Sequence, residues 1–124
     1  MELQGQQQIP AARHVVWAAL NDPAVLAQCV DGCEVFEAQS DDRWRVTVRA
    51  SVGPVKARVT GGLTVSDRVP LQRYHLHGEG EGGVAGFGRM DADVMLEDAD
   101  GGTLLRYGAE AGVGGKLAQI GSRL

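Results

Sequence analysis

The chain has 124 residues and a net charge of −4, so it is sized for one domain with one core and lacks the basic surface of a nucleic-acid-binding protein. Hydrophobic residues make up 44% of the chain but aromatic residues only 5%, and 18 residues are glycine. This composition predicts a core of Val, Leu and Ala, with space left by glycine.

The sequence predicts a cytoplasmic location. No apolar run approaches the length of a transmembrane helix. The first ten residues, MELQGQQQIP, have neither the basic start nor the apolar stretch of a signal peptide. The two cysteines, Cys29 and Cys33, fit a reducing compartment and are expected to be small buried residues near a helix–strand junction.

The N-terminal part of the chain predicts one strand followed by two short helices. Residues 2–9 alternate between Gln or Glu and smaller or apolar residues, which is typical of a strand. Pro10 suits the first position of a helix, which we expect to run to about Leu20 with one apolar side buried. The run Asn21-Asp22-Pro23 then ends this helix and caps a second one over residues 24–28.

Six further strands are predicted between residues 34 and 113, because polar and apolar residues alternate there. A period of two with one polar and one apolar face indicates an antiparallel sheet that is wet on one side and dry on the other. A hairpin turn is expected at Asp100-Gly101-Gly102. The side chains expected on the dry face are Trp44, Val46, Val48, Ala50, Val52, Val55, Ala57, Val59, Gly61, Leu63, Val65, Tyr74, Leu76, Gly78, Met90, Ala92, Val94, Leu96, Leu105, Tyr107, Ala109, Ala111 and Val113.

The C-terminal residues predict a last helix, which looks truncated. Leu117, Ile120 and Leu124 are spaced three and four apart after Gly114-Gly115, and the chain stops after two or three turns. The order of strand, two helices, six strands and helix predicts a single α+β domain over residues 1–124. We expect a curved antiparallel sheet of about seven strands that encloses an apolar cavity, widened by inward Gly and Ala residues.

Four motifs, in this order along the chain, resemble those of one known family. They are Trp17-Ala-Ala-Leu-Asn-Asp-Pro with Cys29-Val-Asp-Gly-Cys-Glu34, then Gly53-Pro-Val-Lys-Ala57, then Gly78-Glu-Gly80 with Gly83-Val-Ala-Gly-Phe87, and last Gly114-Gly-Lys-Leu-Ala-Gln-Ile-Gly-Ser-Arg-Leu124. Together they are similar to the CoxG family of carbon monoxide dehydrogenase subunits, within the START-like, polyketide-cyclase-like superfamily. The resemblance covers essentially the whole chain.

The resemblance implies a helix-grip fold around an apolar cavity. It also implies an accessory protein of a molybdenum hydroxylase, such as carbon monoxide dehydrogenase, which helps to recruit the enzyme to the inner face of the cytoplasmic membrane and in some members holds a respiratory quinone. Two features depart from the family pattern: Asp31 stands where proline is usual, and the family's C-terminal helix continues well beyond the equivalent of Leu124. A shortened helix would expose Leu117, Ile120 and Leu124, so we expect these side chains to pack in a homodimer.

The residues that could carry chemistry have simpler structural interpretations. The run from Gly78 to Gly88 contains the dinucleotide-binding pattern G-x-G-x-x-G, but a strand is predicted after it, where such a site needs a helix. His75, His77 and Glu79 share a face and could ligate zinc, but that face is the solvated one. The dry face offers no nucleophile with a base and no paired carboxylates, so we expect no metal, no cofactor and no catalysis.

The inward residues with polar groups leave two interpretations open. Trp17 is either core or a ligand platform, and the hydroxyls of Tyr74 and Tyr107 bind either a ligand or the main chain. The residues predicted to line the cavity are Trp17, Leu20, Leu26, Val46, Val48, Val59, Leu63, Tyr74, Leu76, Phe87, Met90, Val94, Tyr107, Leu117 and Ile120.

The leading hypothesis is a non-catalytic accessory subunit that binds a lipophilic molecule, such as a quinone, and links a molybdenum hydroxylase to the membrane. The first alternative is a stand-alone module that binds a lipid or another small hydrophobic molecule. The second is a cyclase- or lyase-type enzyme, which rests on the superfamily resemblance alone.

Overall fold

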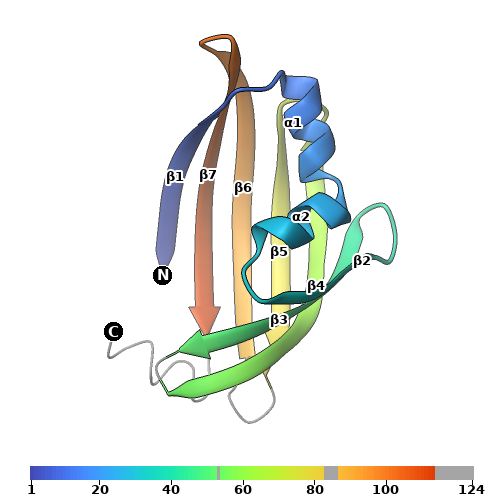
Figure 1. The fold of residues 1–124 in the computed structure, drawn as a ribbon, viewed down its shortest axis with the longest axis vertical. Helices are drawn as coiled ribbons and strands as arrows, with labels where there is room; N and C mark the ends of the chain where they lie inside the picture. Colours follow the sequence, from blue (N-terminus) through green and yellow to red (C-terminus); the bar gives the residue numbers. More distant parts are fainter. Residues whose placement is uncertain (53, 83–86, 114–124) are drawn as a thin grey trace.

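The computed structural model describes residues 1–52, 54–82 and 87–113, with the backbone alone at positions 50, 52, 55, 57, 87 and 113. Two helices and seven strands make up this part of the chain (Figure 1). In chain order they are β1 (Glu2–Ile9), α1 (Arg13–Leu20), α2 (Pro23–Cys29), β2 (Cys33–Ala38), β3 (Arg43–Val52), β4 (Val55–Val69), β5 (Arg73–Glu81), β6 (Phe87–Ala99) and β7 (Gly102–Val113). The expected α+β class is confirmed.

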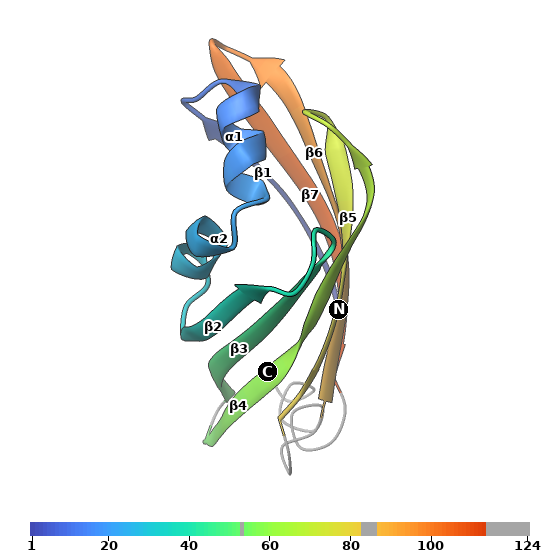
Figure 2. The same ribbon diagram turned by 90° about the vertical axis from the view of Figure 1, so that its right-hand side faces the viewer.

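All the strands belong to one antiparallel sheet, with the order β1-β7-β6-β5-β4-β3-β2. Figure 2 shows that the sheet is strongly curved and that both helices lie on its concave side. This is the helix-grip arrangement of a START-like domain. The expected C-terminal helix, with Leu117, Ile120 and Leu124, lies outside the described residues, as does the dimer contact proposed for it.

The cross-strand register confirms the predicted division into an inner and an outer face. Trp44 pairs with Leu63, Leu63 with Gly78, and Gly78 with Met90, so these residues form one row across the concave face. The row continues to Ala111 on β7. Because side chains alternate along each strand, the arginines, histidines and carboxylates between these positions lie on the convex face.

The hydrophobic core lies where the helices meet the sheet. Trp44, Val65, Tyr74 and Val94 are buried at its centre. Trp17 of α1 packs its ring against Tyr74, with the ring centroids 5.7 Å apart. The other partly buried side chains around this cluster are Leu20, Leu26, Phe36, Leu63, Leu76 and Leu105. The low aromatic content is therefore concentrated in the core.

The first helix begins three residues later than the sequence predicts, at Arg13. Ile9 still pairs with Thr103 in the ladder between β1 and β7. The N–H of Ala11 donates to the Ile9 carbonyl at 2.9 Å, and the fully buried Thr103 donates its hydroxyl to the Ala11 carbonyl at 2.7 Å. These contacts hold residues 9–11 in a turn, so tertiary contacts override the preference of Pro10 for a helix start.

The second helix begins as the sequence predicts. Asp22 is its N-cap, and its side chain accepts a hydrogen bond from the N–H of Ala24 at 3.0 Å. Pro23 occupies the first turn, where a missing N–H costs nothing. Neither this helix nor the other described one is long and apolar enough to cross a membrane.

Candidate functional site

An apolar pocket lies on the concave face of the sheet, beyond the end of the hydrophobic core. Its volume is about 340 Å³, near the lower end of the range for small-molecule sites. Val30 and Phe36 border it from the α2–β2 side, and strands β3 to β7 supply the rest. The lining side chains from the strands are Val46, Val48, Val59, Leu63, Met90 and Ala111, with glycines at positions 61, 62, 78, 80, 88 and 112.

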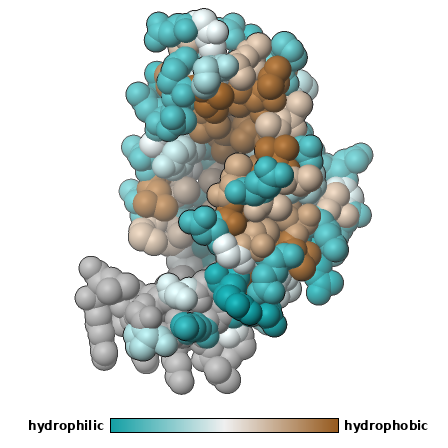
Figure 3. Space-filling model, viewed as in Figure 1, coloured by the Kyte–Doolittle hydropathy of each residue, from teal (hydrophilic) through white to brown (hydrophobic). Residues whose placement is uncertain are grey.

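The lining of the apolar pocket offers almost no polar side chain. Glu79 and Arg89 border it, but both occupy alternate positions whose side chains lie on the convex face. On the face of the molecule seen in Figure 3, hydrophobic residues gather around α1 and α2 and hydrophilic residues surround them. The pocket is therefore suited to an apolar molecule held by shape and contact area rather than by hydrogen bonds.

The predicted cavity residues fall into three groups in the structure. Five of them lie together in the apolar pocket: Val46, Val48, Val59, Leu63 and Met90. Six pack in or against the hydrophobic core instead, namely Trp17, Leu20, Leu26, Tyr74, Leu76 and Val94. Leu117, Ile120 and the side chain of Phe87 lie outside the described residues.

The two inward tyrosines have different surroundings. The hydroxyl of Tyr74 donates to the main-chain carbonyl of Leu20 at 3.1 Å, and burial raises the pKa of Tyr74 to about 12. This hydroxyl therefore has a structural partner already. Tyr107 lies across Gly5 of β1 and keeps 41% of its surface exposed, so it is the more accessible of the two hydroxyls.

Sequence reasoning missed Val30, Phe36 and Ala111 as pocket residues. Phe36 follows the alternation of β2 and pairs with Val46, so the pattern itself contained the signal. Val30 ends α2 and belongs to no strand, so periodicity gives no indication of its position. Ala111 was expected on the dry face, but its small side chain gave no reason to choose it over larger neighbours.

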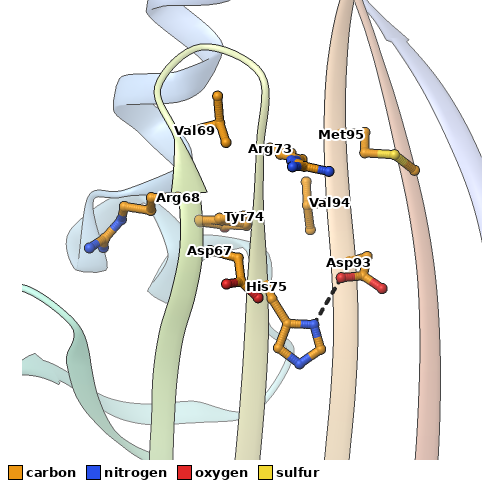
Figure 4. Close-up of a pocket in the computed structure, with 9 residues that line it drawn as sticks. All are labelled: Asp67, Arg68, Val69, Arg73, Tyr74, His75, Asp93, Val94 and Met95. Atoms are coloured by element: carbon orange, nitrogen blue, oxygen red, sulfur yellow. Dashed lines mark hydrogen bonds and ion pairs between the residues drawn. The ribbon is translucent and has the colours of Figure 1, made fainter.

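A second hollow, of about 510 Å³, lies at the turn between β4 and β5 and has a charged lining (Figure 4). Arg68, its central cation, already donates to the side chains of Asn21 and Asp42 at 3.0 and 3.2 Å and to the Asp41 carbonyl at 2.9 Å. These bonds fix the end of α1 and the β2–β3 turn to β4. The hollow is thus part of the structural frame, and Arg68 has little capacity left for a ligand.

The histidines on the convex face are held by carboxylates. The ring of His75 bonds to Asp93 at 2.8 Å and Asp91 at 3.1 Å, and that of His77 bonds to Asp91 at 2.8 Å and Glu79 at 3.2 Å. The hydrogen bond to Asp93 and then that to Asp91 raise the pKa of His75, and those to Asp91 and Glu79 raise the pKa of His77. Within the described ranges, no group of three His, Cys, Asp or Glu residues is placed to hold a metal ion.

The remaining candidate residues carry no evident chemistry. Cys33 is half-buried and its thiol lies 3.4 Å from the Val35 carbonyl, but Cys29 is exposed, so the expectation that both are buried is wrong for Cys29. The reason is that Cys29 ends α2, a helix with no buried residue. Gly78 and Gly80 lie within β5, and the next described element is strand β6 rather than the helix that a pyrophosphate site needs.

The family relationship follows from a comparison with known sequences. The profile of the family described by the CoxG subunit of carbon monoxide dehydrogenase matches residues 5–124, which is nearly the entire chain. The chain belongs to the CoxG family. No curated protein sequence is significantly similar to it.

Solved structures agree with this assignment. A conserved protein from Geobacillus kaustophilus is 31% identical with a TM-score of 0.88, and the match covers 99% of this chain and 81% of that one. An uncharacterized protein from Rhizobium leguminosarum is 17% identical, with a TM-score of 0.71 and coverages of 99% and 84%. A protein from Deinococcus radiodurans is 17% identical, with a TM-score of 0.69 and coverages of 99% and 92%. The last two similarities concern the fold alone.

Proposed function

We propose that this protein is an accessory subunit that holds a lipophilic molecule, such as a respiratory quinone, and helps to attach a molybdenum hydroxylase to the membrane. The family assignment supports an accessory role beside carbon monoxide dehydrogenase. The observation that carries the ligand part is the apolar pocket of about 340 Å³ on the concave face.

The chemistry of the pocket favours binding over catalysis. A general acid or base must lie within hydrogen-bond reach of the reacting group. The described side chains that project into the pocket are Val, Leu, Phe, Met and Ala, and none of these can transfer a proton. Binding energy would come from apolar area removed from water, at about 25 cal/mol per Å².

The ligand part can be tested by quinone extraction from vesicles. Purified protein is incubated with vesicles containing a respiratory quinone, separated from them, and extracted for quantification of the quinone it retains. Met90→Gln places an amide in the apolar pocket and should lower the retained quinone about tenfold or more. Met95→Gln is the matched control, because Met95 lies on the convex face of the same strand.

The wild-type protein and Met95→Gln should both carry quinone away from the vesicles. Equal retention by Met90→Gln would remove the apolar pocket as the binding site, and failure of the wild type to retain any quinone would remove the ligand role altogether. Retention of lipid of every class, with no preference for quinone, would favour the stand-alone binding module.

The partner part needs a separate measurement. Vesicle flotation is carried out with a purified molybdenum hydroxylase in the presence and absence of this protein. Enrichment of the hydroxylase with the vesicles only when the protein is added is the expected result. If the hydroxylase stays in the soluble fraction under both conditions, the recruiting role is wrong, whatever the outcome for the ligand.

A further inference from the structure

The floor of the apolar pocket is a row of three glycines that the register places side by side. Gly61 of β4 pairs with Gly80 of β5, and Gly80 pairs with Gly88 of β6. All three occupy inner-face positions and line the pocket. We call Gly61, Gly80 and Gly88 the glycine row. With neighbouring strands about 4.8 Å apart, the row forms a strip roughly 10 Å wide that carries no side chains.

The walls of the pocket stand on every described side of the glycine row. Val46 and Phe36 continue the same row toward the sheet edge, through pairing with Gly61 and with each other. Val59 lies two residues from Gly61 on one side, and Leu63 lies two residues away on the other. Met90 stands two residues from Gly88. The result is a flat floor bounded by branched and flexible apolar side chains.

Backbone requirements explain only one of these glycines. A Cβ on Gly61 would overlap the carbonyl oxygen of Glu79, so this position needs glycine because two strands approach closely. Gly80 has no positive φ, and a Cβ there would meet only the tip of Val59, at 2.8 Å from its Cγ1. Glycine in a strand interior costs stability, and it often marks a place where a ligand approaches the backbone.

We infer that the glycine row is the seat of a flat, conjugated ring, and that Gly80 is the residue that selects for flatness. This inference rests on the proposed function, since it assumes that the apolar pocket holds a lipophilic ligand. A planar ring lying face-down can touch the backbone of all three strands at once, whereas a puckered aliphatic ring touches it at a few points. Each atom pair in contact contributes only about 0.1–0.2 kcal/mol, so complementarity over the full face decides the affinity.

The experiment compares two probes that share one carbon skeleton, 2-naphthol and its saturated analogue decahydro-2-naphthol. Binding to the full chain is measured by calorimetry. The flat probe should bind about tenfold more tightly than the puckered one, a difference that corresponds to about 1.4 kcal/mol. Gly80→Val should lower the affinity for 2-naphthol about tenfold and bring the two probes close to parity, because branched carbon then stands on the floor.

Gly108→Val is the matched control, since Gly108 lies in β7 of the same sheet but a Cβ there meets nothing within 4 Å. It should leave both affinities unchanged. A measurement on the wild-type protein removes any dependence on the variants folding: the Hα resonances of Gly80 and Gly88 should shift upfield when 2-naphthol is added, because they then lie above the ring face.

Three results would count against the inference in different ways. Equal affinity for the two probes, with quinone still retained from vesicles, would overturn the flat seat and leave the proposed function intact. Unchanged affinity in Gly80→Val, or downfield shifts at Gly80 and Gly88, would place the ring elsewhere in the pocket. No binding of either probe to the wild type, together with no retained quinone, would overturn the inference and the proposed ligand role together.

Discussion

Tyr74 shows at the level of one residue how a core position differs from a ligand contact. Its hydroxyl bonds to the Leu20 carbonyl and its ring packs on Trp17, so the side chain ties α1 to the sheet. Tyr74→Phe should lower the free energy of unfolding by about 1 kcal/mol, because one buried hydrogen bond is lost. Chemical denaturation measures this change. If stability were unchanged and quinone retention fell, the hydroxyl would be a ligand contact instead.

The histidines of the convex face give the protein a defined pH dependence. Because the folded-state pKa values of His75 and His77 are raised, their stabilisation is complete below the unfolded value of about 6.5 and is lost as the pH rises through the raised values. Hydrogen bonds from His77 and then His75 lower the pKa of Asp91, so its contribution is present above about 3.8 and is lost as the pH falls through the lowered value.

Melting temperature should therefore be highest between about pH 4 and pH 6.5 and should fall on either side. The double variant His75→Gln, His77→Gln should flatten the alkaline side of this profile. His14→Gln is the control, because His14 is an exposed residue of α1. An alkaline side that stays equally steep in the double variant would assign the dependence to other groups.

Arg68 acts at the level of whole elements, since it joins three of them. It bonds to Asn21 at the end of α1 and to Asp41 and Asp42 in the β2–β3 turn. Arg68→Met should lower the free energy of unfolding by about 1–2 kcal/mol, because these acceptors lose a charged donor. In Arg106→Met, which removes only an exposed pair with Glu97 at 2.9 Å, the loss should stay below about 1 kcal/mol. Similar losses in both variants would show that the three-way contact adds nothing.

The pairing of β4 with β5 depends on Gly61. Because any Cβ there would overlap the backbone of Glu79, Gly61→Ala should lower the free energy of unfolding by more than about 2 kcal/mol. Gly108→Ala, in β7 where the space is open, should change it by less than about 1 kcal/mol. Thermal unfolding of both variants checks this, and a stable Gly61→Ala protein would mean that the two strands separate easily.

For the molecule as a whole, the sequence could predict which face of each strand is dry but not how far along the strand a residue lies. Val59 and Val65 belong to the same strand and face, yet Val59 lines the apolar pocket and Val65 is buried in the core. That distinction depends on where the helices cover the sheet. The glycine row could not be seen either, because Gly61, Gly80 and Gly88 become neighbours only through the register of three strands.

The helix start at Arg13 shows the same limit on a smaller scale. The preference of Pro10 is local, whereas the contacts of Ile9 and Ala11 with Thr103 come from a strand more than ninety residues away. Local rules predicted the Asp22 cap of α2 correctly, because cap and helix are adjacent in sequence.

Native mass spectrometry tests most directly whether the apolar pocket carries a lipophilic molecule. The protein is isolated from its own cells, its mass is compared before and after denaturation, and any released molecule is extracted with organic solvent and identified. We expect an added mass that is lost on denaturation and that belongs to an apolar molecule with a flat conjugated ring. A protein that carries no added mass, and still carries none after exposure to membranes, would contradict the proposed ligand role.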